Sequence, residues 1–96
     1  MLKIYDKAQW HIDAGEDAEA VVSKLKAVFS FLDAKGLLGA EGKEILDLGI
    51  DSSISIHERM MTDVGKKFMD ECYDKAIDKN DTEIIDALEK EYKAFV

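Results

Sequence analysis

AEAVVSKLKAVFSFLDAKG, at residues 18–36, is the stretch of sequence that decides the fold. Lys35 followed by Gly36 is a typical helix end, because glycine adopts the left-handed conformation at low cost. The preceding residues 13–17, with Gly15 among them, are typical of a turn that leads into a helix N-terminus. The pattern therefore predicts a helix that starts at Ala18 and buries one face, because its apolar residues follow helical spacing: Ala18, Val21, Val22, Leu25, Val28, Phe29 and Leu32.

Two later segments resemble each other. Residues 37–46 (LLGAEGKEIL) align without gaps on residues 60–69 (MMTDVGKKFM), and both contain an apolar pair, a small residue and a Gly-Lys pair. We interpret both as helix starts, with Gly39 and Thr62 as N-caps and a glycine where two backbones approach closely. The sequence leaves open whether the similarity reflects a true duplication.

These starts predict a helix from about Ala40 to Leu48 that Gly49 ends, and a longer one from Asp63 to about Asp78. The buried face of the longer helix is predicted to comprise Val64, Phe68, Cys72 and Ile77. Residues 80–83 (NDTE) fit a capping box, which would open a terminal helix. The apolar side of that helix is predicted at Ile84, Ile85, Leu88, Tyr92 and Phe95.

The remaining segments are more ambiguous. Residues 52–57 are rich in Ser and Ile and alternate apolar with polar side chains, which favours an extended segment. The competing interpretation is a capping box at residues 55–58 (SIHE) that starts a helix at Ile56. Residues 2–13 fit a short strand or turn that docks Trp10 on the core.

Together these patterns predict a single domain over residues 1–96, because no Pro and no Gly/Ser-rich linker marks a boundary. The expected fold class is mainly α: a compact four-helix domain with one or two short extended segments. The alternative is an α+β, winged-helix-like domain, because residues 61–68 look like the segment after a wing. The predicted helix over residues 40–48 argues against DNA binding, since it carries Glu41, Glu44 and Asp47.

Charge and composition limit the function. Thirteen basic and 21 acidic residues give a net charge of -8, which repels nucleic acid and anionic lipid, so we expect neither as a partner. The apolar runs are too short to span a bilayer, and no secretory signal opens the chain. The single cysteine cannot form an internal disulfide, so we expect a reducing, cytoplasmic location.

Reactive groups show no catalytic or metal-binding spacing. His11, His57 and Cys72 do not lie at the spacing of zinc ligands, and Cys72 is interpreted as a small core residue. Ser52, Ser53 and Ser55 have no nucleophile-elbow or phosphate-binding glycine pattern beside them, and so short a chain must use most of its apolar residues for its core. We therefore predict no enzyme activity, no catalytic residues, no metal and no cofactor.

One resemblance to a known family is present. The segment YDKAQWH at residues 5–11 resembles the opening Tyr-Asp-x-Ala-x-Trp-His of an uncharacterised bacterial domain family. Gly36-Leu37 and the Thr62, Gly65 and Phe68 helix start are also similar to that family. Residues 12–15 (IDAG) lack the Gly/Pro-rich stretch that the family has after the histidine. The resemblance implies no activity, because the function of the family is unknown.

The binding candidates are Trp10, His11 and Asp13, with Tyr73 and Tyr92 as further anchors if they are exposed. Asp6 is expected to accept a hydrogen bond from a nearby backbone amide. We predict a non-catalytic acidic protein-interaction domain, with an immunity-type inhibitor of a basic partner protein as the specific version. The alternatives are a winged-helix-like regulator or scaffold and a small enzyme of unknown reaction. The oligomeric state is left open.

Overall fold

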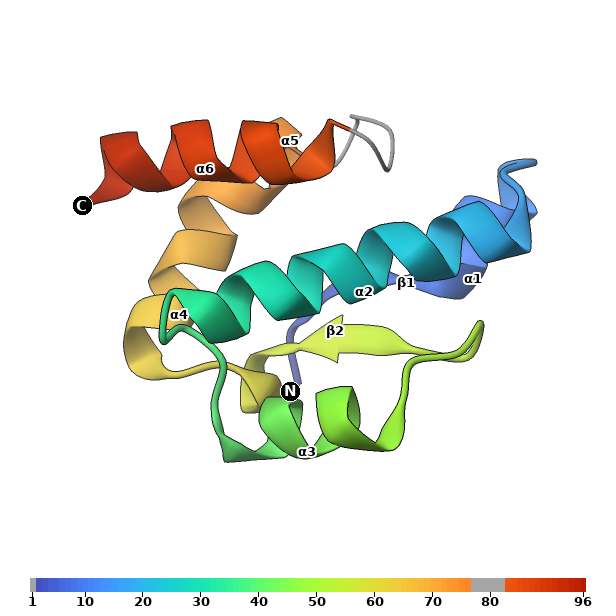
Figure 1. Ribbon diagram of the computed structural model, residues 1–96, viewed down its shortest axis with the longest axis horizontal. Coiled ribbons are helices and arrows are strands. Elements are labelled where there is room, and N and C mark those ends of the chain that lie inside the picture. The colour runs from blue at the N-terminus through green and yellow to red at the C-terminus, as the bar shows by residue number, and fades with distance from the viewer. Residues whose placement is uncertain (1, 77–82) are drawn as a thin grey trace.

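The computed structural model describes residues 2–76 and 83–96, and it is mainly α with short extended segments, as predicted (Figure 1). The extended segments pair as a two-stranded antiparallel sheet. The prediction of a strand or turn over residues 2–13 holds for residues 4–7, but residues 8–13 form a helix instead. In chain order, the elements are β1 (Ile4–Lys7), α1 (Ala8–Asp13), α2 (Ala18–Ala34), α3 (Ala40–Leu48), β2 (Ser55–His57), the 3-10 turn η1 (Glu58–Met60), α4 (Asp63–Phe68), the π-helical segment η2 (Met69–Tyr73), α5 (Asp74–Ala76) and α6 (Ile84–Phe95). Because α4, η2 and α5 follow one another without a gap, they form the predicted third helix.

Helix α2 runs through the middle of the molecule and packs against α1, α3 and α6 (Figure 1). It begins where predicted, because the Asp17 carboxylate accepts a hydrogen bond from the Ala20 amide at 3.1 Å. It ends at Ala34, just before the predicted stop at Lys35 and Gly36, and Gly36 has a φ of +71°. Its buried side chains form the centre of the core: Val21, Leu25, Val28, Phe29, Phe31 and Leu32.

The two similar segments pair with each other. The Gly39 amide donates to the Met60 carbonyl at 2.7 Å, and the Thr62 amide donates to the Leu37 carbonyl at 3.0 Å. In the alignment of the segments Gly39 matches Thr62 and Leu37 matches Met60, so the two hydrogen bonds are equivalent. The pairing therefore has a local two-fold symmetry, and one helix starts from each strand-like arm: α3 after Gly39 and α4 after Thr62.

Both glycines lie at close backbone approaches, as predicted. A Cβ atom on Gly42 would lie 2.6 Å from the Met60 carbonyl oxygen, and one on Gly65 would lie 2.2 Å from the Leu37 carbonyl oxygen. Thr62 caps α4, because its hydroxyl accepts from the Gly65 amide at 3.0 Å. At the two helix starts the equivalent glycines, Gly42 and Gly65, thus face equivalent carbonyl oxygens.

Strand β2 excludes two alternatives for residues 52–58. Residues 55–57 pair with β1, so the capping box that would have started a helix at Ile56 is wrong, and only the short turn η1 follows. The partner of β2 is the N-terminal strand β1 and not a neighbouring hairpin strand. This pairing differs from the hairpin that a wing requires.

The buried face of the helix formed by α4, η2 and α5 differs from the prediction. Phe68 and Cys72 are buried, but Val64 is 53% exposed. Gly65, and not Val64, lies closest to the Leu37 backbone, which rotates the buried face by one residue. Ile77 and most of the predicted capping box at residues 80–83 lie outside the described residues.

The terminal helix α6 packs on α2, η2 and α5 through the predicted side. Ile84 and Leu88 are buried, and Ile85 packs against the core. None of the helices over residues 2–76 and 83–96 combines the length and apolar character that crossing a bilayer requires.

Candidate functional site

A β-bulge at Tyr5 turns a carboxylate into the core. Ile4 pairs with His57, but the next pair joins Asp6 to Ile56, which leaves Tyr5 as the extra residue. Residues directly opposite each other in a sheet share a face, and Ile56 is fully buried. The bulge therefore buries Asp6, where a regular register would have buried Tyr5.

The buried Asp6 carboxylate is satisfied by hydrogen bonds from three residues. The Lys7 amide donates to it at 2.8 Å, and the Tyr73 hydroxyl donates at 2.7 Å. Nε2 of His11 lies 2.8 and 2.9 Å from its two oxygens. The predicted role of Asp6 as an acceptor for a nearby backbone amide is confirmed. Charge-assisted hydrogen bonds of this kind offset the cost of burying a carboxylate.

His11 connects Asp6 to the turn after α1. It lies on α1, one turn of helix beyond the end of β1, so its ring reaches back to Asp6. Its other nitrogen, Nδ1, lies 2.9 Å from Oε2 of Glu16. A histidine ring can donate at both nitrogens only when it is doubly protonated. Burial lowers the pKa of His11, but the hydrogen bonds and negative charges of Asp6 and Glu16 outweigh burial and raise this pKa above its ordinary value.

Tyr73 is the fourth member of this group, which we call the Asp6 network: Asp6, His11, Glu16 and Tyr73. It ends the π-helical segment η2, and its side chain is almost completely buried. Burial and the neighbouring Asp6 carboxylate raise the pKa of Tyr73 well above its ordinary value, so the hydroxyl keeps its proton. π-helical turns and β-bulges are irregularities that recur at functional sites, and here the two meet in one hydrogen bond.

The Asp6 network holds segments together and is poorly arranged for catalysis. A general base needs a free lone pair that faces the substrate, but each His11 ring nitrogen faces a carboxylate. The nearby recess, lined by Tyr5, Asp70 and Tyr73 among others, has a volume of only about 100 Å³. Burial and the charges of Asp70 and Glu58 raise the pKa of Tyr5 to about 12, which leaves it protonated. Among the described residues, no group of His, Cys, Asp and Glu is placed to hold a metal ion.

Trp10 is 51% exposed, so the prediction that it docks on the core is wrong. The six-residue helix α1 uses Ala8 as its buried contact, and this turns Trp10 towards solvent. The Nζ atom of Lys7 lies 5.8 Å from the centroid of the indole ring. Asp13, on the same helix, is exposed and accepts a hydrogen bond from the Gln9 amide group at 2.7 Å. Trp10 and Asp13 are thus exposed on α1, whereas His11 on the same helix is largely buried against Asp6.

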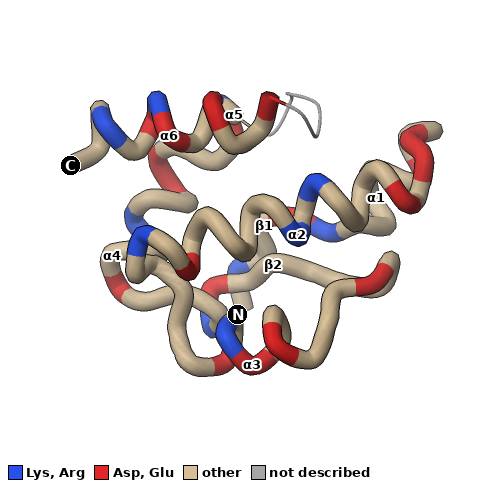
Figure 2. The backbone as a smooth tube through the Cα atoms, viewed as in Figure 1, with Lys and Arg blue, Asp and Glu red and all other residues tan. Residues whose placement is uncertain are grey.

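The end of the molecule that carries Trp10 is acidic. Figure 2 shows acidic residues where α1 turns into α2. We call this surface the docking end, and it consists of Trp10 and four exposed carboxylates: Asp13, Glu16, Asp17 and Glu19. The docking end also has a basic neighbour, because the Nζ atom of Lys7 lies over the Trp10 indole ring. Sequence reasoning did not select Glu16, because its contact with His11 depends on how the turn closes.

The two tyrosines proposed as anchors do not belong to this surface. Tyr73 is buried and fails the condition of exposure, although it reaches His11 through Asp6. Tyr92 is half-buried on α6, where its ring packs against Phe31 and Phe68 at centroid distances of 6.1 and 5.8 Å. Cys72 is buried, as expected of a small core residue, and burial raises the pKa of its thiol.

Replacing Tyr73 with Phe is expected to lower the free energy of unfolding by about 1.5–3 kcal/mol. The change keeps the packed ring but removes one donor from a buried, charged acceptor. Urea unfolding followed by circular dichroism measures the loss. Tyr92→Phe is the matched control: among the described residues its hydroxyl has no hydrogen bond, so we expect a change within about 0.5 kcal/mol. Equal losses in the two variants would contradict the role assigned to Tyr73.

Comparison with known proteins yields no relative: no protein family, no curated protein and no solved structure matches the chain.

Proposed function

We propose that this chain is a non-catalytic acidic protein-interaction domain that binds a basic protein through the docking end. The observation that carries the proposal is the exposed Trp10 on α1 together with four exposed carboxylates on α1, the turn after it and the start of α2, in a molecule with a net charge of -8. Tryptophan is enriched among the residues that dominate binding energy, because it buries a large rigid surface. Carboxylates around such an anchor attract a basic partner and align it on approach.

The specific version of this role is an immunity-type inhibitor that blocks a basic partner, such as a nuclease toxin. An acidic surface can cover the basic groups with which a nuclease holds the phosphate backbone of its substrate. Cytoplasmic location and membership of the bacterial family that opens with Tyr-Asp-x-Ala-x-Trp-His are part of the same proposal. In that motif Asp6 and His11 belong to the Asp6 network, and Trp10 belongs to the docking end.

The alternatives have less support. A regulator that reads DNA with α3 would bring Glu41, Glu44 and Asp47 against phosphate. A small enzyme would need a reactive group that faces a pocket, and both ring nitrogens of His11 are occupied by carboxylates.

The first experiment is capture of proteins from a bacterial lysate on the immobilised chain, followed by purification of the captured protein and calorimetry. We expect a basic protein whose affinity falls as salt rises. Trp10→Ala is expected to weaken binding about tenfold or more, because it removes the aromatic anchor. Asp13→Asn with Glu19→Gln is expected mainly to slow association and to reduce its salt dependence.

Matched controls separate this surface from general acidity. Leu48→Ala removes an apolar side chain that is 80% exposed on α3, and Glu44→Gln with Asp47→Asn removes two charges from the same helix. Neither is expected to change affinity by more than about twofold. Binding that survives Trp10→Ala, or that falls equally with the α3 charges, would exclude the docking end as the interface.

A further inference from the structure

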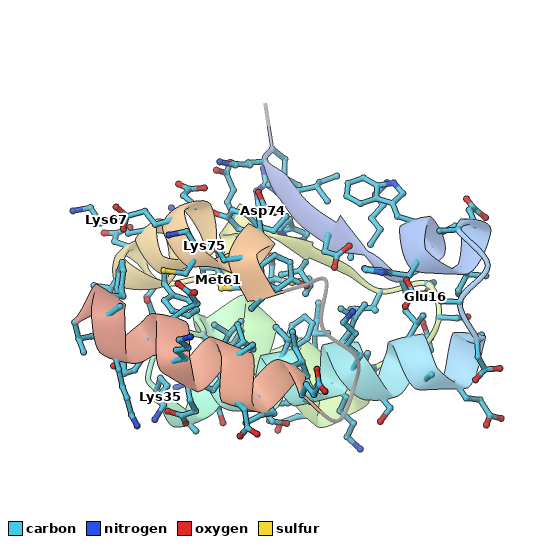
Figure 3. All side chains as sticks on the ribbon, turned by 90° about the horizontal axis from the view of Figure 1, so that it is seen from above. Glu16, Lys35, Met61, Lys67, Asp74 and Lys75 are labelled. Carbon is cyan, nitrogen blue, oxygen red and sulfur yellow. The ribbon has the colours of Figure 1, made fainter. Side chains whose placement is uncertain are left out.

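His11 links two separate parts of the N-terminal region through one ring. Nε2 contacts Asp6 on β1, and Nδ1 contacts Glu16 in the turn between α1 and α2. In Figure 3, Glu16 lies between these two helices. The His11 side chain is only 15% exposed, so the ring itself is largely shielded from water. The turn is therefore attached to the sheet through two charge-assisted contacts that share one imidazolium.

Loss of one proton removes one of these contacts. A neutral ring has one donor and one acceptor nitrogen, and an acceptor nitrogen opposite a carboxylate is repulsive. Asp6 is also held by Tyr73 and by the Lys7 amide, and it has almost no access to water. The Glu16 side chain is 47% exposed and can be hydrated instead. The remaining proton therefore stays on Nε2, and the contact that breaks is the one with Glu16.

The two carboxylates that contact the ring favour its charged form. Asp6 from β1 and Glu16 from the turn contact it directly, and Tyr73 from η2 reaches it through Asp6. Helix α2 packs on α1 and contributes the buried Lys24, which has interactions of its own. The pKa of His11 is raised above 6.5 by its two carboxylate partners, against the lowering effect of burial. Asp13, the last residue of α1, accepts a hydrogen bond from Gln9 and does not bond to the His11 ring.

We propose that His11 is a pH-sensitive latch that holds the turn over residues 14–17 against the sheet when its ring is doubly protonated and releases the turn at Glu16 when the ring is neutral. The latch follows from these contacts alone and does not depend on the proposed binding role. Because the pKa is raised in the folded state, the stabilisation is complete below about pH 6.5 and is lost as the pH rises through the folded-state pKa. The change of state thus falls above pH 6.5.

The chain offers direct reporters of the latch. Trp10 is its only tryptophan and precedes His11 on α1, so indole signals report on this helix alone. The Glu16 amide donates to the His11 carbonyl at 3.1 Å, and its exchange with solvent reports on the turn. His57, on β2, is an internal reference on a separate element.

The test is an NMR titration of the whole chain from about pH 5 to about pH 9, with amide exchange measured at each end of the range. We expect the His11 ring to titrate above pH 6.5, and the Trp10 indole and Glu16 amide signals to shift with the same midpoint. The protection of the Glu16 amide, measured as its exchange rate relative to the intrinsic rate at the same pH, is expected to fall severalfold above that midpoint. Signals of Trp10 and Glu16 that do not follow the His11 ring would overturn the latch.

Glu16→Gln distinguishes the latch from a general charge effect. The amide of glutamine can donate to a neutral Nδ1, so the contact survives loss of the proton. We expect this variant to lower the His11 midpoint and to abolish the pH-dependent loss of amide protection in the turn. Glu19→Gln removes the same charge from the same end without touching His11, and it is expected to keep the wild-type response. Equal midpoints in the two variants would overturn the proposal.

Discussion

Replacing Phe68 with alanine is expected to lower the free energy of unfolding by about 3–5 kcal/mol. Phe68 is fully buried at the end of α4, and its ring contacts three other aromatic rings. The centroid distances are 6.0 Å to Phe31, 5.8 Å to Tyr92 and 5.4 Å to Phe95. These rings lie on α2 and α6, so one side chain connects three helices. Domains of this size are stable by only about 5–15 kcal/mol, so this loss is a large part of the total.

Urea unfolding followed by circular dichroism measures the effect of Phe68→Ala. Leu48→Ala is the matched control, because it also removes a large apolar side chain but at a position that is 80% exposed. We expect the control to change the free energy of unfolding by no more than about 0.5 kcal/mol. A loss in Phe68→Ala that is no larger than that of the control would show that the aromatic cluster does not hold these helices together.

The predictable part of the fold rests on local signals. Helix α3 has its predicted bounds, Ala40–Leu48, because Gly39 precedes it and Gly49, with φ of +108°, ends it. Helix α2 is fixed in the same way by Asp17 and Gly36. In each case the residues that decide the boundary lie within a few positions of it, so a reading of the sequence can find them.

The wrong predictions concern side chains whose burial depends on segments distant in sequence. The sequence predicts Val64 as buried from helical spacing alone, but the close approach of Gly65 to Leu37 sets which side of α4 faces inward. The sequence predicts Trp10 on the core from a short strand or turn over residues 2–13, but residues 8–13 form the helix α1, which buries Ala8 instead. No local pattern in either segment contains this information.

The candidate site shows the same division. Trp10, His11 and Asp13 are close in sequence, and a single short helix carries all three. The hydrogen bond between Tyr73 and Asp6 joins residues 67 positions apart, and it requires both the bulge at Tyr5 and a π-helical turn. A register shift of one residue exchanges the faces of a strand, so the burial of Asp6 follows only from the pairing with β2. The one signal in the sequence was the Tyr-Asp-x-Ala-x-Trp-His motif, which contains two members of the Asp6 network.

Replacing Gly65 with alanine is expected to lower the free energy of unfolding by about 3 kcal/mol, at the upper end of the usual cost of overpacking. The new Cβ atom would lie 2.2 Å from the Leu37 carbonyl oxygen. That oxygen accepts from the Thr62 amide at 3.0 Å and from the Thr62 hydroxyl at 3.1 Å, so it cannot retreat without breaking both hydrogen bonds. Alanine is otherwise favoured over glycine inside a helix by about 1 kcal/mol, so a net loss measures the steric conflict.

The local symmetry supplies the comparison for Gly65→Ala. Gly42→Ala places a Cβ atom 2.6 Å from the equivalent Met60 carbonyl oxygen, and its other close neighbour is the Leu38 side chain, which can rotate. We therefore expect a smaller loss for Gly42→Ala, of about 1–2 kcal/mol. Val64→Ala, at an exposed position beside Gly65, should change stability by about 0.5 kcal/mol or less. If Gly65→Ala unfolds at the same urea concentration as Val64→Ala, the close approach of Gly65 to the Leu37 carbonyl oxygen does not limit the side chain at position 65.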